Sequence, residues 1–201
     1  MWFIYQVTTV FVLLSPSLLF FCLPWEAASH AVARLEHLRT DYLNVFKINS
    51  DEIKYTKLRL WIEHHQEILR VSAALSAATK LTIGHMSIIA GIIIGCLGTQ
   101  ALREGIPKSI IFIMGVLVGC FVVCHAGQSI VDETLGVSYT AYGVSWFKCD
   151  VKIQKAVLFI IMRTQKPVRL ETIPFGAFDY ALYLLIVKTS YTYLTVLNQK
   201  M

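Results

Sequence analysis

The segment SIIFIMGVLVGCFVVCHAGQSIV, residues 109–131, contains no Asp, Glu, Lys or Arg from end to end. An α-helix rises 1.5 Å per residue and the hydrocarbon core of a bilayer is about 30 Å thick, so this segment is long enough to cross a membrane. The preceding segment LTIGHMSIIAGIIIGCLGTQAL, residues 81–102, has the same property. Together they predict two transmembrane helices joined by a short loop, residues 103–108.

Two further segments extend this pattern toward the chain ends. Residues 1–25 are uncharged, and the segment YALYLLIVKTSYTYLTVLNQ, residues 180–199, carries only Lys188. A signal peptide is the alternative for residues 1–25, but no basic region precedes its apolar run, which favours a span. A charge in the middle of a span is costly against lipid, so the last helix is expected to face protein or water.

The composition supports a membrane protein. Of 201 residues, 56% are hydrophobic and only 15% are charged, with a mean hydropathy of +0.60. Such a composition excludes intrinsic disorder, and five cysteines are too few and odd in number for a disulfide-stapled miniprotein. The net charge of +5 would suit nucleic acid, but the cations lie between the apolar segments, so we expect contact with membrane lipid and none with nucleic acid.

The distribution of Lys and Arg predicts the orientation. Eight of these residues lie in 26–80 and six in 132–179, whereas two lie in the loop 103–108. Because cations concentrate in cytoplasmic loops, the two longer segments are expected in the cytoplasm and the loop outside. Four spans then place both chain ends outside the cell.

The cytoplasmic segments are expected to be helical. Apolar side chains recur at helical spacing, which predicts packing against neighbouring helices, with a break at Asn49-Ser50-Asp51. The run 156–162 is too short to span and predicts a buried helix near the membrane surface. The expected fold class is therefore an all-α membrane protein: a bundle of four transmembrane helices plus cytoplasmic helices. The two apolar stripes are Val32, Leu35, Leu38, Tyr42 and Phe46, and Leu58, Ile62, His65 and Leu69.

Motifs of catalysis are not found in the sequence. There is no HExxH, GxxxxGK[ST] or GxSxG pattern. Cys120 and Cys124, at positions i and i+4, share a helical face and are followed by His125, but in a span rich in small residues this pattern favours helix packing over a metal site. Gly91 and Gly95 have the GxxxG spacing of a helix-packing face. We therefore expect no enzyme activity, no cofactor and no metal.

From residue 119 onward the chain resembles the insect odorant receptor family. The run Arg163-Thr164-Gln165-Lys166-Pro167, followed by KTSYTYLTVLNQ at 188–199, is the most specific part of the resemblance. Upstream, His65-Gln66-Glu67-Ile68-Leu69 matches the pattern that the family carries before its fifth span. Single positions that add to the resemblance are Cys124, Gly127, Ala141, Tyr142 and Trp146.

The resemblance implies a seven-helix receptor of which this chain holds spans four to seven. It implies a ligand-gated cation channel that detects volatile odorants as a heterotetramer with a shared co-receptor. Residues 132–179 would include an anchor helix where subunits meet, and 180–199 would line the pore. The implied location is the plasma membrane of olfactory neuron dendrites, and the 201 residues are expected to be a partial or truncated chain.

Four residues are candidates for lining the pore. Thr189, Thr192, Val196 and Gln199 follow one another at spacings of 3, 4 and 3, so they share one helical face, and three of them are polar. The resemblance places Val196 at a hydrophobic constriction, where a ring of apolar side chains can close a pore by dewetting. The alternative is that the hydroxyls bond neighbouring helices.

The resemblance also implies an odorant pocket in the outer half of the membrane. An apolar pocket with aromatic walls and few polar groups suits a small volatile ligand. Ordinary helix packing is the alternative for each candidate. The candidates are Tyr5, Thr8, Thr9, Phe11 and Phe112.

Other classes remain open from sequence. Thr192-Tyr193 followed by Gln199 fits the ending of a gustatory receptor, whereas the run 163–167 and Trp146 favour the odorant branch. A complete four-span protein of structural or transport type is a second alternative. A G-protein-coupled receptor is opposed by the expected outside C-terminus.

Overall fold

The computed structural model describes the backbone of residues 2–104 and 107–199, and the side chains of residues 5, 8, 22–101 and 109–196. The described chain is mainly helical, as expected. Its elements are α1 (Trp2–Phe46), α2 (Asp51–Glu104), α3 (Pro107–Gly143), the single 3-10 turn η1 (Trp146–Lys148), α4 (Val151–Thr164), β1 (Glu171–Thr172), β2 (Gly176–Ala177) and α5 (Tyr180–Gln199).

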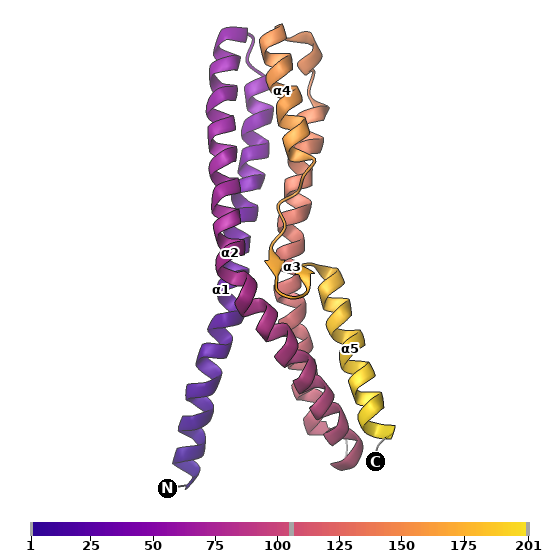
Figure 1. Cartoon of the computed structure of the whole chain (residues 1–201). Coiled ribbons are helices and arrows are strands. Elements are labelled where there is room, and N and C mark those ends of the chain that lie inside the picture. The colour runs from indigo at the N-terminus through magenta and orange to yellow at the C-terminus, as the bar shows by residue number, and fades with distance from the viewer. Residues whose placement is uncertain (1, 105–106, 200–201) are drawn as a thin grey trace.

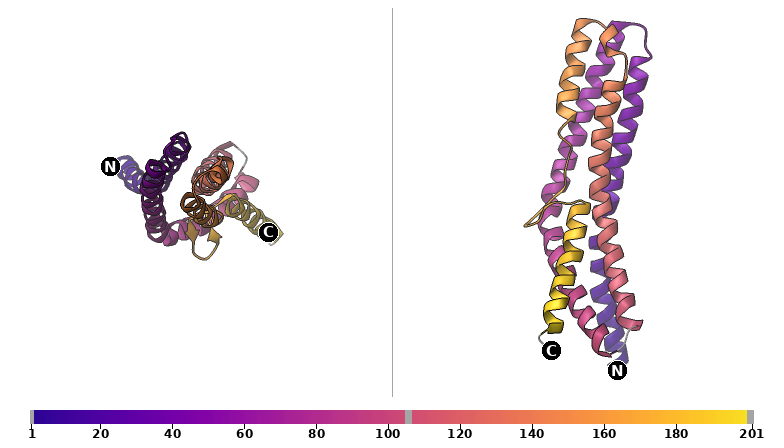
Figure 2. Two further views of the ribbon diagram at one scale, coloured as in Figure 1. Left: turned by 90° about the horizontal axis from the view of Figure 1, so that it is seen from above. Right: turned by 90° about the vertical axis from the view of Figure 1, so that its right-hand side faces the viewer.

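The helices form an elongated bundle that is compact at one end and open at the other (Figure 1). At the compact end, the second half of α1, the first half of α2, the second half of α3 and α4 run side by side (Figures 1 and 2). At the open end α1 diverges from the other helices, whereas α5 lies along α2 and α3. The compact end is formed by the segments whose charges predict a cytoplasmic location.

A single apolar core holds the compact end together. The predicted stripes supply it: Leu38 and Tyr42 of α1 are each 1% exposed, and Leu58 of α2 is fully buried. The Trp61 indole Nε1 donates a hydrogen bond to the Leu38 carbonyl at 2.8 Å, so this polar atom is satisfied inside the core. Each buried apolar side chain of this size contributes about 1.5–3 kcal/mol. Helix α4 completes the core with Ile153, Val157 and Ile160.

An ion pair ties α1 to α3 beside this core. The Arg39 guanidinium donates to Glu133 Oε2 at 2.9 Å and, through Nε, to Thr140 Oγ1 at 3.1 Å. The two charged side chains are only 37% and 28% exposed. Gly136 lies under the guanidinium, where a Cβ atom would come within 2.9 Å of Arg39 Nη1.

A short hairpin connects α4 to α5, and the sequence did not lead us to expect it. Strands β1 and β2 pair antiparallel with Glu171 opposite Ala177 and Thr172 opposite Gly176. The Ile173 amide donates to the Lys80 carbonyl of α2 at 3.2 Å. A Cβ atom on Gly84 would overlap the Ile173 carbonyl, and one on Gly127 would overlap the Phe178 carbonyl. Because Gly84 lies on α2 and Gly127 on α3, these two glycines let the connecting segment contact both helices closely.

Two helices in the described part of the chain are long and apolar enough to cross a membrane, Asp51–Ala101 and Ser109–Lys148. They contain the predicted spans 81–102 and 109–131. In the most apolar 18-residue stretch of each helix, only 33% and 28% of the residues are buried inside the protein. Most of the apolar surface of these stretches therefore faces outward. Most side chains of the predicted span 1–25 lie outside the described residues, and α5 is not one of the two helices.

Candidate functional site

Helix α5 packs on α2 through a stripe of glycines. On α5, Ile186 and Ser190 are only 6% and 3% exposed. A Cβ atom on Gly95 would overlap the Tyr193 ring, and one on Gly98 would lie 2.9 Å from Leu194 Cδ1. The predicted glycine-rich packing face therefore exists, and α5 occupies it.

The pore-lining candidates lie on a different face of α5. Thr189, Thr192 and Val196 are all exposed in the described chain, and Val196 is 45% exposed. At 100° per residue they fall within about 60° of one another around the helix axis. Thr189 also borders a cavity of about 190 Å³ between α2 and α5. The fourth candidate, Gln199, has a side chain that lies outside the described residues.

The serine and threonine hydroxyl groups of α5 bond within their own helix. Thr189 Oγ1 donates to the Leu185 carbonyl at 2.7 Å, and Thr192 Oγ1 donates to the Lys188 carbonyl at 3.0 Å. A hydroxyl satisfied in this way can lie in an apolar setting at little cost. For these two residues the hydrogen bonds therefore do not tie α5 to a neighbouring helix.

An aromatic cluster fixes the first turn of α5 against α3. The Tyr180 hydroxyl lies 2.6 Å from His125 Nδ1, and the two rings have centroids 6.1 Å apart. Phe121 and Trp25 stack on the same imidazole at 6.0 and 5.9 Å. The packing role expected for His125 is thus carried by an aromatic contact and a hydrogen bond, and sequence spacing could not identify its partner 55 residues away.

The odorant-pocket candidates are not gathered in one place. Tyr5 and Phe112 are 67% and 68% exposed, and Thr8 is exposed on the helix that carries Tyr5. The first turns of α1, which carry Tyr5 and Thr8, diverge from α3, which carries Phe112 (Figure 1). The side chains of Thr9 and Phe11 lie outside the described residues.

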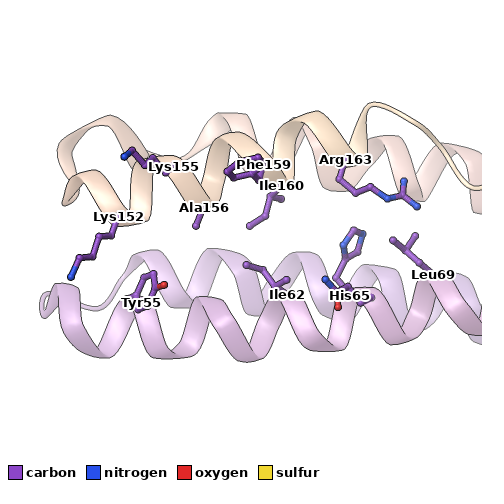
Figure 3. A pocket seen from close by; sticks show the side chains of 11 residues that line it. Tyr55, Ile62, His65, Leu69, Lys152, Lys155, Ala156, Phe159, Ile160 and Arg163 are labelled. Atoms are coloured by element: carbon purple, nitrogen blue, oxygen red, sulfur yellow. The ribbon is translucent and has the colours of Figure 1, made fainter.

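A second site lies at the compact end, in a cavity of about 650 Å³ between α2 and α4 (Figure 3). Its floor is apolar and includes Ile62, Leu69 and Ile160. Three cations line its α4 side, and the residues that line it include no carboxylate. The three cations are Lys152, Lys155 and Arg163.

His65 is the least exposed polar residue of this cavity. It is 4% exposed, stacks on Trp61 with ring centroids 5.2 Å apart, and points toward α4 (Figure 3). Burial, and then the nearby Arg163 charge, lower the pKa of His65 to about 4, so the imidazole is neutral at neutral pH. Its Nε2 atom is buried and has no hydrogen-bond partner among the described residues.

The sequence held a signal for this second site. Lys152, Lys155, Phe159 and Arg163 are spaced so that they share one face of a helix. The apolar run 156–162 drew attention to the opposite, buried face of α4 instead. Nothing in the spacing indicates that this face lies against His65, which is about 100 positions earlier in the chain.

The sequence as a whole matches one family. Residues 1–191 match the sequence model of a family described as 7tm Odorant receptor. Odorant receptor 22c of Drosophila melanogaster is 24% identical over 190 residues, which cover 90% of this chain and 46% of that protein. Odorant receptor 85b of the same species is 28% identical over 110 residues, which cover 52% of this chain and 28% of that protein.

The fold also matches solved structures. The insect olfactory receptor OR5 from Machilis hrabei in complex with eugenol superposes with a TM-score of 0.77 at 14% identity, and the match covers 87% of this chain and 46% of that chain. A second structure of OR5 gives a TM-score of 0.71. The chain thus spans less than half the length of the relatives and structures that it matches.

Proposed function

The chain belongs to the insect 7tm odorant receptor family, and from this premise we propose that it forms part of a ligand-gated cation channel that detects volatile odorants. The observation that carries the channel proposal is the exposed face of α5, with Thr189, Thr192 and Val196 in one row. The relatives are odorant receptors rather than enzymes. A gustatory receptor and a structural four-span protein are therefore not favoured.

The proposed topology has four spans, corresponding to spans four to seven of the receptor. Helices α2 and α3 supply two of them, and residues 1–25 and 180–199 supply the others. The compact end of the bundle lies in the cytoplasm, because it carries most of the Lys and Arg residues. The proposed location is the plasma membrane, on the dendrites of olfactory neurons.

The exposed face of α5 is proposed to meet the same helix of other subunits around a central pore. A heterotetramer with an odorant co-receptor would enclose Thr192 and Val196, which are exposed in a single chain. Gln199 is proposed to follow at the outer mouth. Polar side chains whose hydroxyls are already bonded to their own helix tolerate both the closed, dry state and the open, wet state.

The odorant site is proposed to lie in the outer half of the membrane. The solved relative from Machilis hrabei is described in complex with eugenol, a small organic molecule. Helix α1 diverges from α3 toward the open end of the bundle (Figure 1). In the whole receptor the odorant site is proposed to include Tyr5, Thr8, Thr9, Phe11 and Phe112.

Cysteine accessibility tests the pore assignment. The chain replaces the matched half of Drosophila Odorant receptor 22c, and the chimera is expressed with an odorant co-receptor. Thr192→Cys is compared with Ser190→Cys, two residues away on the buried face of the same helix. A positively charged thiosulfonate reagent applied outside should reduce the odorant-evoked current of Thr192→Cys and leave that of Ser190→Cys unchanged.

The parent chimera corrects for the five native cysteines, which are all free thiols. Block of Ser190→Cys alone, at equal surface expression, would contradict the proposed pore face. Equal insensitivity of both variants, with normal currents, would place the pore elsewhere.

A further inference from the structure

Lys188 is the only Asp, Glu, Lys or Arg residue within the segments 81–102, 109–131 and 180–199. We propose that this residue sets the ion selectivity of the channel. Its ammonium group faces the water on the cytoplasmic side of the pore and disfavours divalent cations relative to monovalent ones. The inference rests on the proposed channel function and adds to it the class of ion that this subunit favours.

The side chain of Lys188 lies on the face of α5 opposite to the helix packing. The buried residues Ile186 and Ser190 stand two positions before and two positions after it. Two positions correspond to a helix rotation of about 200°, so Lys188 lies about 160° around the axis from both. It is exposed in the described chain, and α5 runs along the edge of the bundle (Figures 1 and 2). Contact with α2 therefore does not cover this residue.

Lys188 shares the proposed pore face. It precedes Thr192 by one helical turn, and the Thr192 hydroxyl donates to the Lys188 carbonyl at 3.0 Å. Val196 lies eight residues beyond Lys188, or about 12 Å along the helix. Side chains of a helix lean toward its N-terminus, which for α5 is the cytoplasmic end in the proposed topology. The ammonium group therefore lies on the cytoplasmic side of the proposed constriction.

Within the described chain, the charge of Lys188 has no acidic partner. None of the ion pairs between described residues includes it. The nearest acidic residue along the sequence is Asp179, whose Oδ1 atom accepts hydrogen bonds from the amides of Ala181 and Leu182 at 3.0 and 3.2 Å. That carboxylate therefore caps the helix. A charge in a membrane span faces the protein interior or a water-filled space, and a pore supplies such a space.

A fixed positive charge acts more strongly on a divalent cation than on a monovalent one. The Coulomb energy is proportional to the charge of the ion. At about 8 Å in water, one lysine lowers the local concentration of Ca²⁺ about twofold more than that of Na⁺. Charged side chains that line a pore set ion selectivity in this way. A subunit that carries Lys188 therefore lowers the permeability of the channel to Ca²⁺ relative to Na⁺.

Reversal potentials test the inference in the chimera with Odorant receptor 22c, expressed with an odorant co-receptor. Lys188→Gln should raise the Ca²⁺ to Na⁺ permeability ratio of the odorant-evoked current about twofold, and Lys188→Glu about fivefold. Lys188→Arg keeps the charge and should keep the parental ratio. Lys47→Gln is the matched control, because it removes the same charge in the turn between α1 and α2, at the tip of the compact end.

Restoring the charge separates an electrostatic role from a structural one. Lys188→Cys should show the raised permeability ratio. The reagent 2-aminoethyl methanethiosulfonate, applied to the cytoplasmic side of excised patches, should return the ratio to the parental value, because it attaches an ammonium group to the thiol. The parent chimera, treated in the same way, corrects for the native cysteines.

Parental ratios in Lys188→Gln and Lys188→Cys, with currents of normal size, would overturn the inference, and so would an equal change in Lys47→Gln. If these Lys188 variants keep the parental ratio while Thr192→Cys is blocked, the channel function stands and only the selectivity role is lost. If Thr192→Cys is not blocked, both are lost. If Lys188→Glu does not reach the cell surface, Lys188→Gln and Lys188→Cys decide.

Discussion

The ring of Tyr193 on α5 fills the space that a side chain at Gly95 of α2 would need. The two helices are therefore in contact at a point where only glycine is accommodated without a shift. Because Thr192 and Val196 lie next to this contact along α5, the fit of Tyr193 against Gly95 also sets the direction in which the proposed pore face points.

Gly95→Ala should weaken the packing of α5 on α2. Overpacking at a close contact costs about 1–3 kcal/mol, so the melting temperature and the surface level of the protein should both fall. Gly115→Ala is the control, because no described atom lies within 4 Å of a Cβ atom at Gly115. Adding Tyr193→Ala to Gly95→Ala should restore stability in part. If Gly95→Ala and Gly115→Ala lowered the melting temperature equally, this would contradict the contact between Gly95 and Tyr193.

Val196→Ser or Val196→Asn should raise the resting conductance of the chimeric receptor and leave the order of preferred odorants unchanged. An apolar ring keeps a closed pore dry, and a polar side chain stabilises water within it. Leu184→Ser is the control, since Leu184 is 55% exposed on another face of α5. Whole-cell recording at matched surface expression decides; a leak of equal size in both variants would show that Val196 does not form the constriction.

Glu133→Gln should lower the free energy of unfolding by about 1–2 kcal/mol, because it leaves the half-buried Arg39 without its charged partner. Glu63→Gln is the matched control. Its carboxylate lies 3.4 Å from Arg59, but both side chains are mostly exposed, so a change below about 0.5 kcal/mol is expected. Denaturant unfolding in detergent measures both changes, and similar losses for the two variants would contradict the role of the α1–α3 ion pair.

Acidification should destabilise the compact end through His65. Its pKa is about 4 in the folded protein against 6.5 in the unfolded chain, so below pH 6.5 the unfolded chain binds the extra proton. Stability is therefore lost as the pH falls from 6.5 toward 4, by up to about 3 kcal/mol. After burial, the second cause is the charge of Arg163 on α4, which also opposes protonation of His65.

Melting temperatures at pH 7.5 and pH 5 measure this effect. His65→Phe keeps an aromatic ring against Trp61 and removes both nitrogens, so the loss of stability on acidification should be smaller than in the parent. His64→Phe, at the exposed neighbouring position, should retain the parental loss. A parental loss in His65→Phe would show that another group is responsible.

Antibody access tests the orientation. A tag after Met201 should be reached on intact cells, whereas a tag inserted near Asn49, in the turn between α1 and α2, should need permeabilised cells. The expectation follows from the concentration of Lys and Arg at the compact end. The reverse pattern of staining would invert the topology and remove the support for the channel proposal.

Sequence periodicity predicted what depends on one helix at a time. The stripe through Leu38 and Tyr42 is buried, the break at Asn49-Ser50-Asp51 separates α1 from α2, and Thr189 and Thr192 share a face. These features follow from the 3.6-residue repeat and from capping chemistry, both of which are local.

Features made by distant segments were not predicted. The cavity needs His65 and Arg163 to face each other, and the aromatic cluster needs His125 to meet Tyr180. The hairpin was missed because its strands are only two residues long, too short for an alternating pattern of apolar and polar residues to be recognised. Its contact with Gly84 depends on a helix about 90 positions earlier in the chain, which no local pattern records.

The hairpin that touches α2 and α3 has a mechanical consequence for α5. The first turn of α5 is held in place by backbone contacts at Gly84 and Gly127 and by the Tyr180–His125 hydrogen bond. This turn is therefore the pivot, the fixed point about which α5 can tilt. Val196 lies 16 residues beyond this pivot, or roughly 24 Å along the helix, so a tilt of about 5° displaces it by about 2 Å. Because Tyr193 and Leu194 rest on Gly95 and Gly98, a tilt of this size carries the adjoining part of α2 with it and moves Val196 on the proposed pore face.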